Sequence, residues 1–124
     1  MSERRVNPRR HLKSYLQVLD NNTKNIVGHL VNINQHGAMM ISENPISDDT
    51  SLRLRLVLPE KFEGNDSIDI RSRSVWCQQD RFNPDLYASG FKIERINHTD
   101  ETFIDRFIEE FCLKPVEEVN IQVY

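Results

Sequence analysis

LRLRLVL, residues 52–58, decides the fold class, because leucine recurs at every second position along this stretch. Successive side chains of a β-strand point to opposite faces of a sheet, so the leucines share one face. The opposite face carries Arg53, Arg55 and Val57. One apolar face and one largely charged face are typical of an antiparallel sheet that covers a core on one side. The stretch therefore predicts a half-buried antiparallel strand.

Five further segments have the composition of short strands and are separated by turn-prone residues. They cover residues 12–19, 25–33, 38–42, 68–77 and 86–96. The segment at 68–77 alternates in the same way, with Ile68, Ile70 and Trp76 on one face and Asp69, Arg71 and Arg73 on the other. Loops are expected at 43–50, at 60–66 around Gly64, and at 78–85.

A helix is expected after the last of these strands. Apolar residues recur there at spacings of three and four, which is the period of a helix with one apolar face. These residues are Phe103, Ile104, Phe107, Ile108 and Phe111. Asn97 or Thr99 is expected to provide the N-cap, and Pro115 is expected to end the helix. An aromatic stripe of this kind more often packs on a core than lines a cofactor pocket.

Six short strands, regular turns and one late helix predict a mainly β protein, built as a small antiparallel barrel or sandwich. The length of 124 residues fits one domain with a modest core. We expect a flexible arginine-rich arm over residues 1–11, a folded region over 12–114 and a tail over 115–124. The tail alternates again, so it could add an edge strand, contact a partner or remain disordered.

The overall composition is that of a soluble globular protein, with 38% hydrophobic and 28% charged residues. The apolar runs are too short to cross a bilayer, so no membrane insertion is expected. The polar, arginine-rich start does not resemble a signal peptide, which makes the cytoplasm the expected location. Cys77 and Cys112 are far apart in the sequence and are expected to be reduced thiols.

Two short polar clusters carry the information on function. Residues 4–10 read RRVNPRR, and residues 32–37 read NINQHG. The first 13 residues have a formal charge of +4, so a net charge of −3 leaves −7 on the remainder. A basic arm on an acidic body indicates a local anion site and argues against a general nucleic-acid coat. A solvated tail would have the same composition.

The residue types in these clusters suit a ligand that contains phosphates and guanines. Arginine supplies fixed positive charge, forked donors for guanine O6 and N7, and a flat group that stacks on a base. Asparagine can both donate and accept, so it can read a guanine edge. Glycine allows the backbone to come close to a ligand. Together the clusters provide the parts of a guanine dinucleotide site.

In this order and at this spacing, the two clusters resemble the motifs of the PilZ domain, a family of bacterial receptors for cyclic di-GMP. Arg5 and Arg9 match R-x-x-x-R, and the second cluster matches [D/N]-x-[S/N]-x-x-G. The resemblance covers roughly residues 4–112. It implies a six-stranded antiparallel β-barrel with a C-terminal α-helix, which settles the choice between barrel and sandwich.

The resemblance also implies which residues bind the nucleotide. They are Arg4, Arg5, Arg9, Asn32, Asn34 and Gly37. The arginines would contact phosphates and stack on guanines, and the second motif would read guanine edges. Arg10 and His36 lie inside the clusters without a fixed family role and are additional candidates. Asn34 replaces the usual serine, so its amide could hydrogen-bond to the ligand or crowd it.

No catalytic constellation is visible, so neither enzymatic activity nor a cofactor or metal is expected. The histidines lack metal-ligand spacing, and no phosphate-binding glycine loop is present. The leading interpretation is a cyclic di-GMP receptor that changes conformation and signals to a protein partner in motility, adhesion or biofilm control. The alternative is a PilZ-like interaction module that does not bind the nucleotide. A nucleic-acid binder is disfavoured because the strands lack an aromatic stacking platform.

Overall fold

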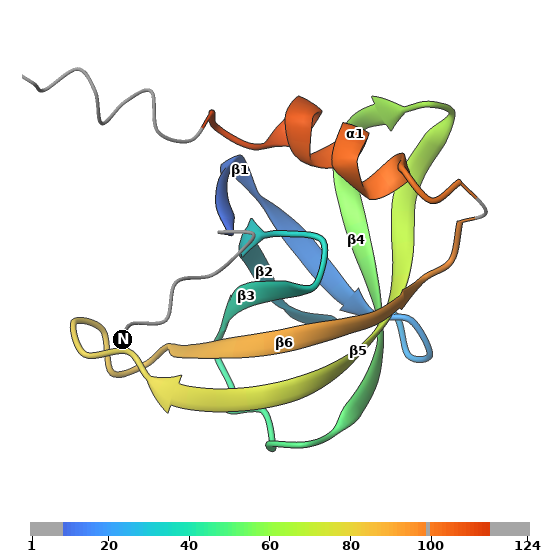
Figure 1. Ribbon diagram of the computed structural model, residues 1–124. Helices are drawn as coiled ribbons and strands as arrows, with labels where there is room; N and C mark the ends of the chain where they lie inside the picture. Colours follow the sequence, from blue (N-terminus) through green and yellow to red (C-terminus); the bar gives the residue numbers. More distant parts are fainter. Residues whose placement is uncertain (1–8, 99, 115–124) are drawn as a thin grey trace, which may run out of the picture.

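The computed structural model describes residues 9–98 and 100–114, which form six strands followed by one helix (Figure 1). The elements are β1 (Arg10–Asp20), β2 (Ile26–Ile33), β3 (Gly37–Ser42), β4 (Ser51–Phe62), β5 (Asn65–Gln79), β6 (Tyr87–Ile96) and α1 (Phe103–Phe111). The strands close into an antiparallel barrel in the order β1-β2-β3-β6-β5-β4. The predicted mainly β fold, a six-stranded barrel with a C-terminal helix, is therefore confirmed.

The barrel interior is filled by alternate residues of the strands. Leu54 and Leu56 of β4 are buried, as the alternation at 52–58 predicts, and they pair with Ile70 and Ile68 of β5. Full burial of one such side chain stabilises the fold by about 1.5–3 kcal/mol. Because the alternation fixes which face is buried, it also fixes the outward direction of the charged residues between them.

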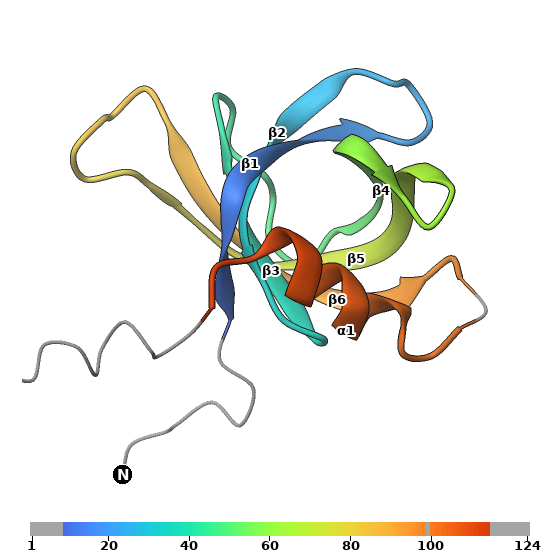
Figure 2. The same cartoon turned by 90° about the horizontal axis from the view of Figure 1, so that it is seen from above.

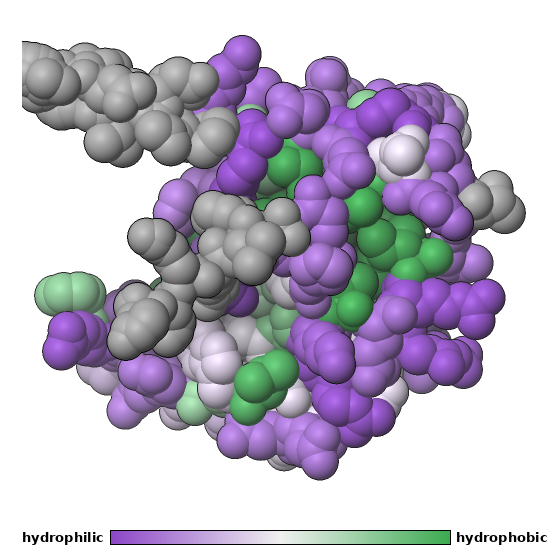
Figure 3. Space-filling model, viewed as in Figure 1, coloured by the Kyte–Doolittle hydropathy of each residue, from purple (hydrophilic) through white to green (hydrophobic). Residues whose placement is uncertain are grey.

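The helix α1 lies across one end of the barrel (Figures 1 and 2). Its aromatic stripe packs on Phe62 of β4, whose ring centroid is 5.5 Å from those of Phe103 and Phe111 and 6.4 Å from that of Phe107. A strip of apolar side chains shows below the helix on a largely hydrophilic face (Figure 3). The stripe therefore belongs to the core, as the sequence indicates.

The prediction of a loop at 60–66 is wrong, because β4 and β5 form one long hairpin with a two-residue turn. Phe62 pairs with Asn65, and the turn residues Glu63 and Gly64 have φ of 51° and 82°. Two consecutive residues with positive φ fit the turn type whose twist matches paired strands. The pairing register shifts between Val57 and Phe62. The extended hairpin places Phe62 against the helix, where its ring is half-buried.

The predicted N-cap is also corrected, because the helix begins after Thr102 and Asn97 does not cap it. Thr99, the other candidate, lies outside the described residues. Arg106 instead stabilises this end of the helix through hydrogen bonds of 2.8 and 2.9 Å to Glu63 and 2.7 Å to Asp100. These contacts lower the pKa of Glu63 and hold the pKa of Asp100 at about 2.

The strand β1 begins at Arg10, so Arg10 and His11, which the sequence analysis assigned to the arm, belong to the sheet. They pair with the end of β2, and the backbone N–H of Leu113 donates to the carbonyl of His11 over 2.8 Å. Main-chain partners on both sides account for this longer strand. The predictions for residues 1–8 and for the tail at 115–124 lie outside the described residues.

Candidate functional site

The turn between β2 and β3 is held by the side chain of Asn34. Its Oδ1 accepts hydrogen bonds from the backbone N–H groups of His36 (2.7 Å) and Gly37 (2.8 Å). The backbone N–H of Asn34 also donates to the carbonyl of Gly37 over 2.8 Å. This arrangement is an Asx turn, in which an amide oxygen replaces a backbone acceptor. The side chain is buried, so its oxygen serves the shape of the turn.

Gly37 opens β3 at a place where the backbone of β6 comes very close. A Cβ at this position would lie 3.0 Å from the carbonyl oxygen of Phe91. The residue paired with Gly37 is Lys92 of β6, which is exposed on the same outer face. The glycine therefore allows β3 and β6 to approach closely, and the cation of Lys92 belongs to the residue paired with it.

Asn32 of β2 is 8% exposed, and its Oδ1 has no hydrogen-bond partner among the described residues. Its Nδ2 has only a weak contact of 4.0 Å with the sulfur of Met39. A buried acceptor without a partner costs about 1–3 kcal/mol. Such orphaned atoms are rare in native structures and call for an explanation. The oxygen is a buried acceptor beside the predicted ligand turn.

Arg9 joins the first sequence cluster to the second. Its Nη1 donates over 3.5 Å to the carbonyl of Ala38, and it lies 3.9 Å from the position of a Cβ on Gly37. The structure therefore brings Arg9 to the surface next to the turn, although 28 residues separate it from Gly37 along the chain. Arg4 and Arg5, the other arginines implied to bind ligand, lie outside the described residues.

An outward-facing row of residues crosses the barrel from the turn. Asn32 pairs with Met39 of β3, Met39 with Gly90 of β6, and Gly90 with Trp76 of β5. A Cβ on Gly90 would collide with the indole of Trp76, so the ring lies over this glycine. The row offers an acceptor at one end and an aromatic surface at the other.

Arg10 and His36, the additional candidates, have different settings. The Nη1 of Arg10 forms a 2.7 Å ion pair with Glu109, and its Nε donates to the carbonyl of Leu113 over 3.0 Å. Arg10 thus ties β1 to the helix and lines a hollow of about 370 Å³ between the helix and the turn. His36 is exposed at the tip of the turn, which fits a solvent-facing histidine.

Lys92 and Trp76 are the neighbours that the sequence analysis missed. Both are placed by the β3–β6 and β6–β5 pairings, which join segments far apart in the sequence. The alternation assigned Trp76 to the face of Ile68 and Ile70, which is wrong. The pairing register shifts between Ser74 and Trp76, and this turns the indole to the outer face, over Gly90. Their position depends on barrel closure, which periodicity does not specify.

The described part of the chain contains neither a metal-binding cluster nor a membrane-spanning helix. No group of three or more histidine, cysteine or acidic residues could hold a metal ion there. Within the same residues, no helix has the length and apolar character that crossing a bilayer requires. Cys77 and Cys112 are free thiols, and burial raises the pKa of Cys112 to about 11.

The family model of the PilZ domain matches residues 3–110, which include both sequence clusters and the whole barrel. The chain belongs to the PilZ domain family. PilZ domains are ligand-binding and adaptor modules rather than enzymes, and the family comprises receptors for cyclic di-GMP. The family suggested by the two motifs is therefore confirmed.

Among solved structures, this PilZ chain is similar to MotI/DgrA, the inhibitor of motility of Bacillus subtilis. The TM-score is 0.66 at 18% sequence identity, and the match covers 96% of this chain and 53% of that chain. The PilZ chain thus spans about half the length of that protein, and a likeness at this identity shows the fold alone. None of the curated proteins matches the chain.

Proposed function

We propose that this PilZ domain is a receptor for cyclic di-GMP, which binds on the outer face of the barrel beside the β2–β3 turn. The observation that carries the proposal is the meeting of Arg9 with the turn, where Asn32 holds a buried oxygen without a partner. The cation of Arg9 complements the anionic phosphates of the ligand, and the unpartnered oxygen of Asn32 complements the N–H donors of its guanines.

The chemistry assigns a different part of the ligand to each group. The guanidinium of Arg9 can bind a phosphate with two parallel bonds or stack on a guanine. The Oδ1 of Asn32 can accept from the amino group of a guanine, which would supply its missing partner. The sulfur of Met39 lies 4.0 Å from the Nδ2 of the same amide, and its flexible side chain can turn aside to admit a base.

The rest of the surface extends these contacts. Lys92 adds positive charge next to Gly37, and Trp76 provides a ring on which a second guanine can stack. Base stacking on an aromatic side chain contributes about 1–3 kcal/mol. Arg4 and Arg5 complete the proposed site, because the arginine motif needs two or more cations to hold two phosphates. Arg10 remains an additional candidate, which would first have to leave Glu109.

The proposed output is a signal to a protein partner. The similar MotI/DgrA is an inhibitor of motility, so we propose a role in motility-related regulation, with adhesion and biofilm control as related outcomes. The alternative is a PilZ interaction module that acts without the nucleotide. The two differ in whether cyclic di-GMP binds at all, which makes ligand binding the decisive property.

The lone tryptophan provides a direct test. Titration of the protein with cyclic di-GMP should change the fluorescence of Trp76 saturably, whereas GMP and GTP at the same concentrations should have little effect. Asn32→Ala should weaken the response, and Arg81→Ala, at an exposed loop arginine, should serve as the matched control. A response of equal size to GMP, or none at saturating cyclic di-GMP, would favour the alternative.

A further inference from the structure

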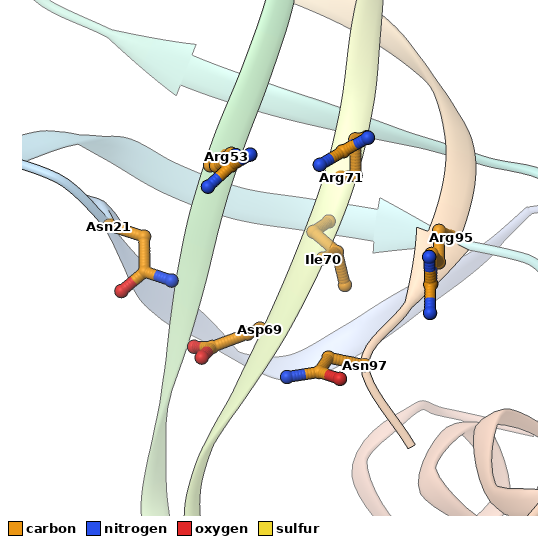
Figure 4. Close-up of a pocket in the computed structure, with 7 residues that line it drawn as sticks. All are labelled: Asn21, Arg53, Asp69, Ile70, Arg71, Arg95 and Asn97. Carbon is orange, nitrogen blue, oxygen red and sulfur yellow. The ribbon is translucent and has the colours of Figure 1, made fainter. Parts of the chain in front are cut away.

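Three arginines stand side by side on the outer face of the barrel, on β4, β5 and β6. Arg71 of β5 is the direct cross-strand partner of both Arg53 on β4 and Arg95 on β6. All three, which we call the arginine row, are exposed. They line a hollow of about 240 Å³, and Figure 4 shows them on three neighbouring strands. The other lining residues are Asn21, Asp69, Ile70 and Asn97.

The arginine row differs from the arginines next to it on the same strands. Arg55 forms bonds of 2.8 and 3.2 Å with Asp69, and Arg73 forms a 3.2 Å ion pair with Glu94. Within residues 9–98 and 100–114, no member of the arginine row has an ion pair or a side-chain hydrogen bond. The row is therefore a patch of uncompensated positive charge.

This arrangement is unfavourable for the isolated protein. Like charges placed directly opposite each other on neighbouring strands destabilise a sheet. The chain has 19 acidic residues and a net charge of −3, so carboxylates are plentiful. The one carboxylate in the hollow, Asp69, is already bound by Arg55, which keeps its pKa low. An external anion would relieve the repulsion and use the donors of all three side chains.

We propose that the arginine row is a docking site for an acidic segment of a partner protein. Neighbouring strands lie about 4.8 Å apart, so the row extends over about 10 Å, which suits two or three successive carboxylates of an extended segment. Each guanidinium can bind a carboxylate through two parallel bonds. The amides of Asn21 and Asn97 can pair with the backbone of the segment.

The lining favours this occupant over two others. None of the residues around the hollow is aromatic, so the stacking platform of single-stranded nucleic-acid sites is lacking there. The hollow is also smaller than the range of about 300–1,000 Å³ typical of small-molecule pockets. The row shares no residue with the proposed cyclic di-GMP site, so the inference holds whether or not that site binds.

The test is an NMR titration of the ¹⁵N-labelled full chain with a capped peptide of six glutamates. Hexauridylate and inorganic polyphosphate serve as comparison anions. The peptide should shift the amides around the arginine row saturably. The variant R53Q/R71Q/R95Q should weaken its binding at least tenfold, and the matched variant K61Q/R81Q/K114Q should change it less than twofold. Cyclic di-GMP, titrated separately, should bind equally to both variants.

A second variant keeps the test decisive if R53Q/R71Q/R95Q fails to fold. Arg71→Glu puts a carboxylate between two arginines, so the melting temperature should rise while the peptide shifts disappear. Peptide shifts away from the row, or equal weakening in the two triple variants, would overturn the docking site. Tighter binding of hexauridylate or polyphosphate than of the peptide at the row would overturn the acidic-protein assignment.

Discussion

Replacing Asn32 by leucine is expected to stabilise the fold, whereas the same replacement at Asn34 is expected to destabilise it. The two asparagines make a matched pair, because both are 8% exposed and they are two residues apart. They differ in whether the amide oxygen accepts a hydrogen bond. That of Asn32 has no partner among the described residues, and that of Asn34 accepts two backbone hydrogen bonds.

The magnitudes follow from these contacts. Asn32→Leu removes an unsatisfied buried acceptor, which costs about 1–3 kcal/mol, and its only loss is a weak contact with the Met39 sulfur. We therefore expect the free energy of unfolding to rise by about 1 kcal/mol or more. Asn34→Leu removes two hydrogen bonds, each with a net value of about 0.5–1.5 kcal/mol, so the free energy of unfolding should fall by about 1–3 kcal/mol.

The assay is urea denaturation of the two variants and the wild type, followed by circular dichroism and by Trp76 fluorescence. Equal slopes in the three transitions would show that the midpoints report stability. A loss of more than about 1 kcal/mol in Asn32→Leu would refute the reasoning, because it would mean that the oxygen is satisfied. The stabilised variant should also bind cyclic di-GMP much more weakly, since it lacks the proposed guanine acceptor.

Three further predictions concern the turn and the helix. Arg9→Ala should change the free energy of unfolding by less than about 0.5 kcal/mol but weaken cyclic di-GMP binding by about 1.5–3 kcal/mol, as measured by denaturation and calorimetry. Gly37→Ala should lower the free energy of unfolding by about 1–3 kcal/mol, because the new Cβ would lie 3.0 Å from the carbonyl oxygen of Phe91. An unchanged urea midpoint would show that β6 moves to make room for the methyl group. Arg106 lowers the pKa of Asp100 to about 2, so its stabilisation is present above the ordinary carboxyl pKa and is lost as the pH falls toward 2. Arg106→Gln should flatten the acid dependence of the melting temperature in that window, and an unaltered slope would contradict this assignment.

Local patterns were sufficient to predict the elements of the fold. The alternation at 52–58 gave the buried face of β4, and the stripe from Phe103 to Phe111 gave the face of the helix that covers the barrel. The hairpin turn was misplaced because Phe62 extends the strand after Pro59 interrupts the alternation. Its apolar ring is explained only by the helix that it contacts, more than 40 residues later.

The candidate site could be predicted only in part, for a similar reason. The motifs named Arg9, Asn32 and Gly37, and the structure places Arg9 and Gly37 together. The Asn34 oxygen accepts two hydrogen bonds within the turn, and this role could not be predicted because it depends on the local backbone geometry and not on the residue type alone. Lys92 reaches the turn through strand pairing, which arises from closure of the whole barrel.

Isothermal titration of the wild-type protein with cyclic di-GMP tests the central claim most directly. The account predicts saturable binding in the micromolar range or tighter, which corresponds to about −8 kcal/mol, and much weaker binding by Asn32→Leu in the same buffer. The absence of a binding isotherm for the wild type up to millimolar ligand would contradict the receptor function. Equal affinity of the two proteins would contradict the role assigned to Asn32.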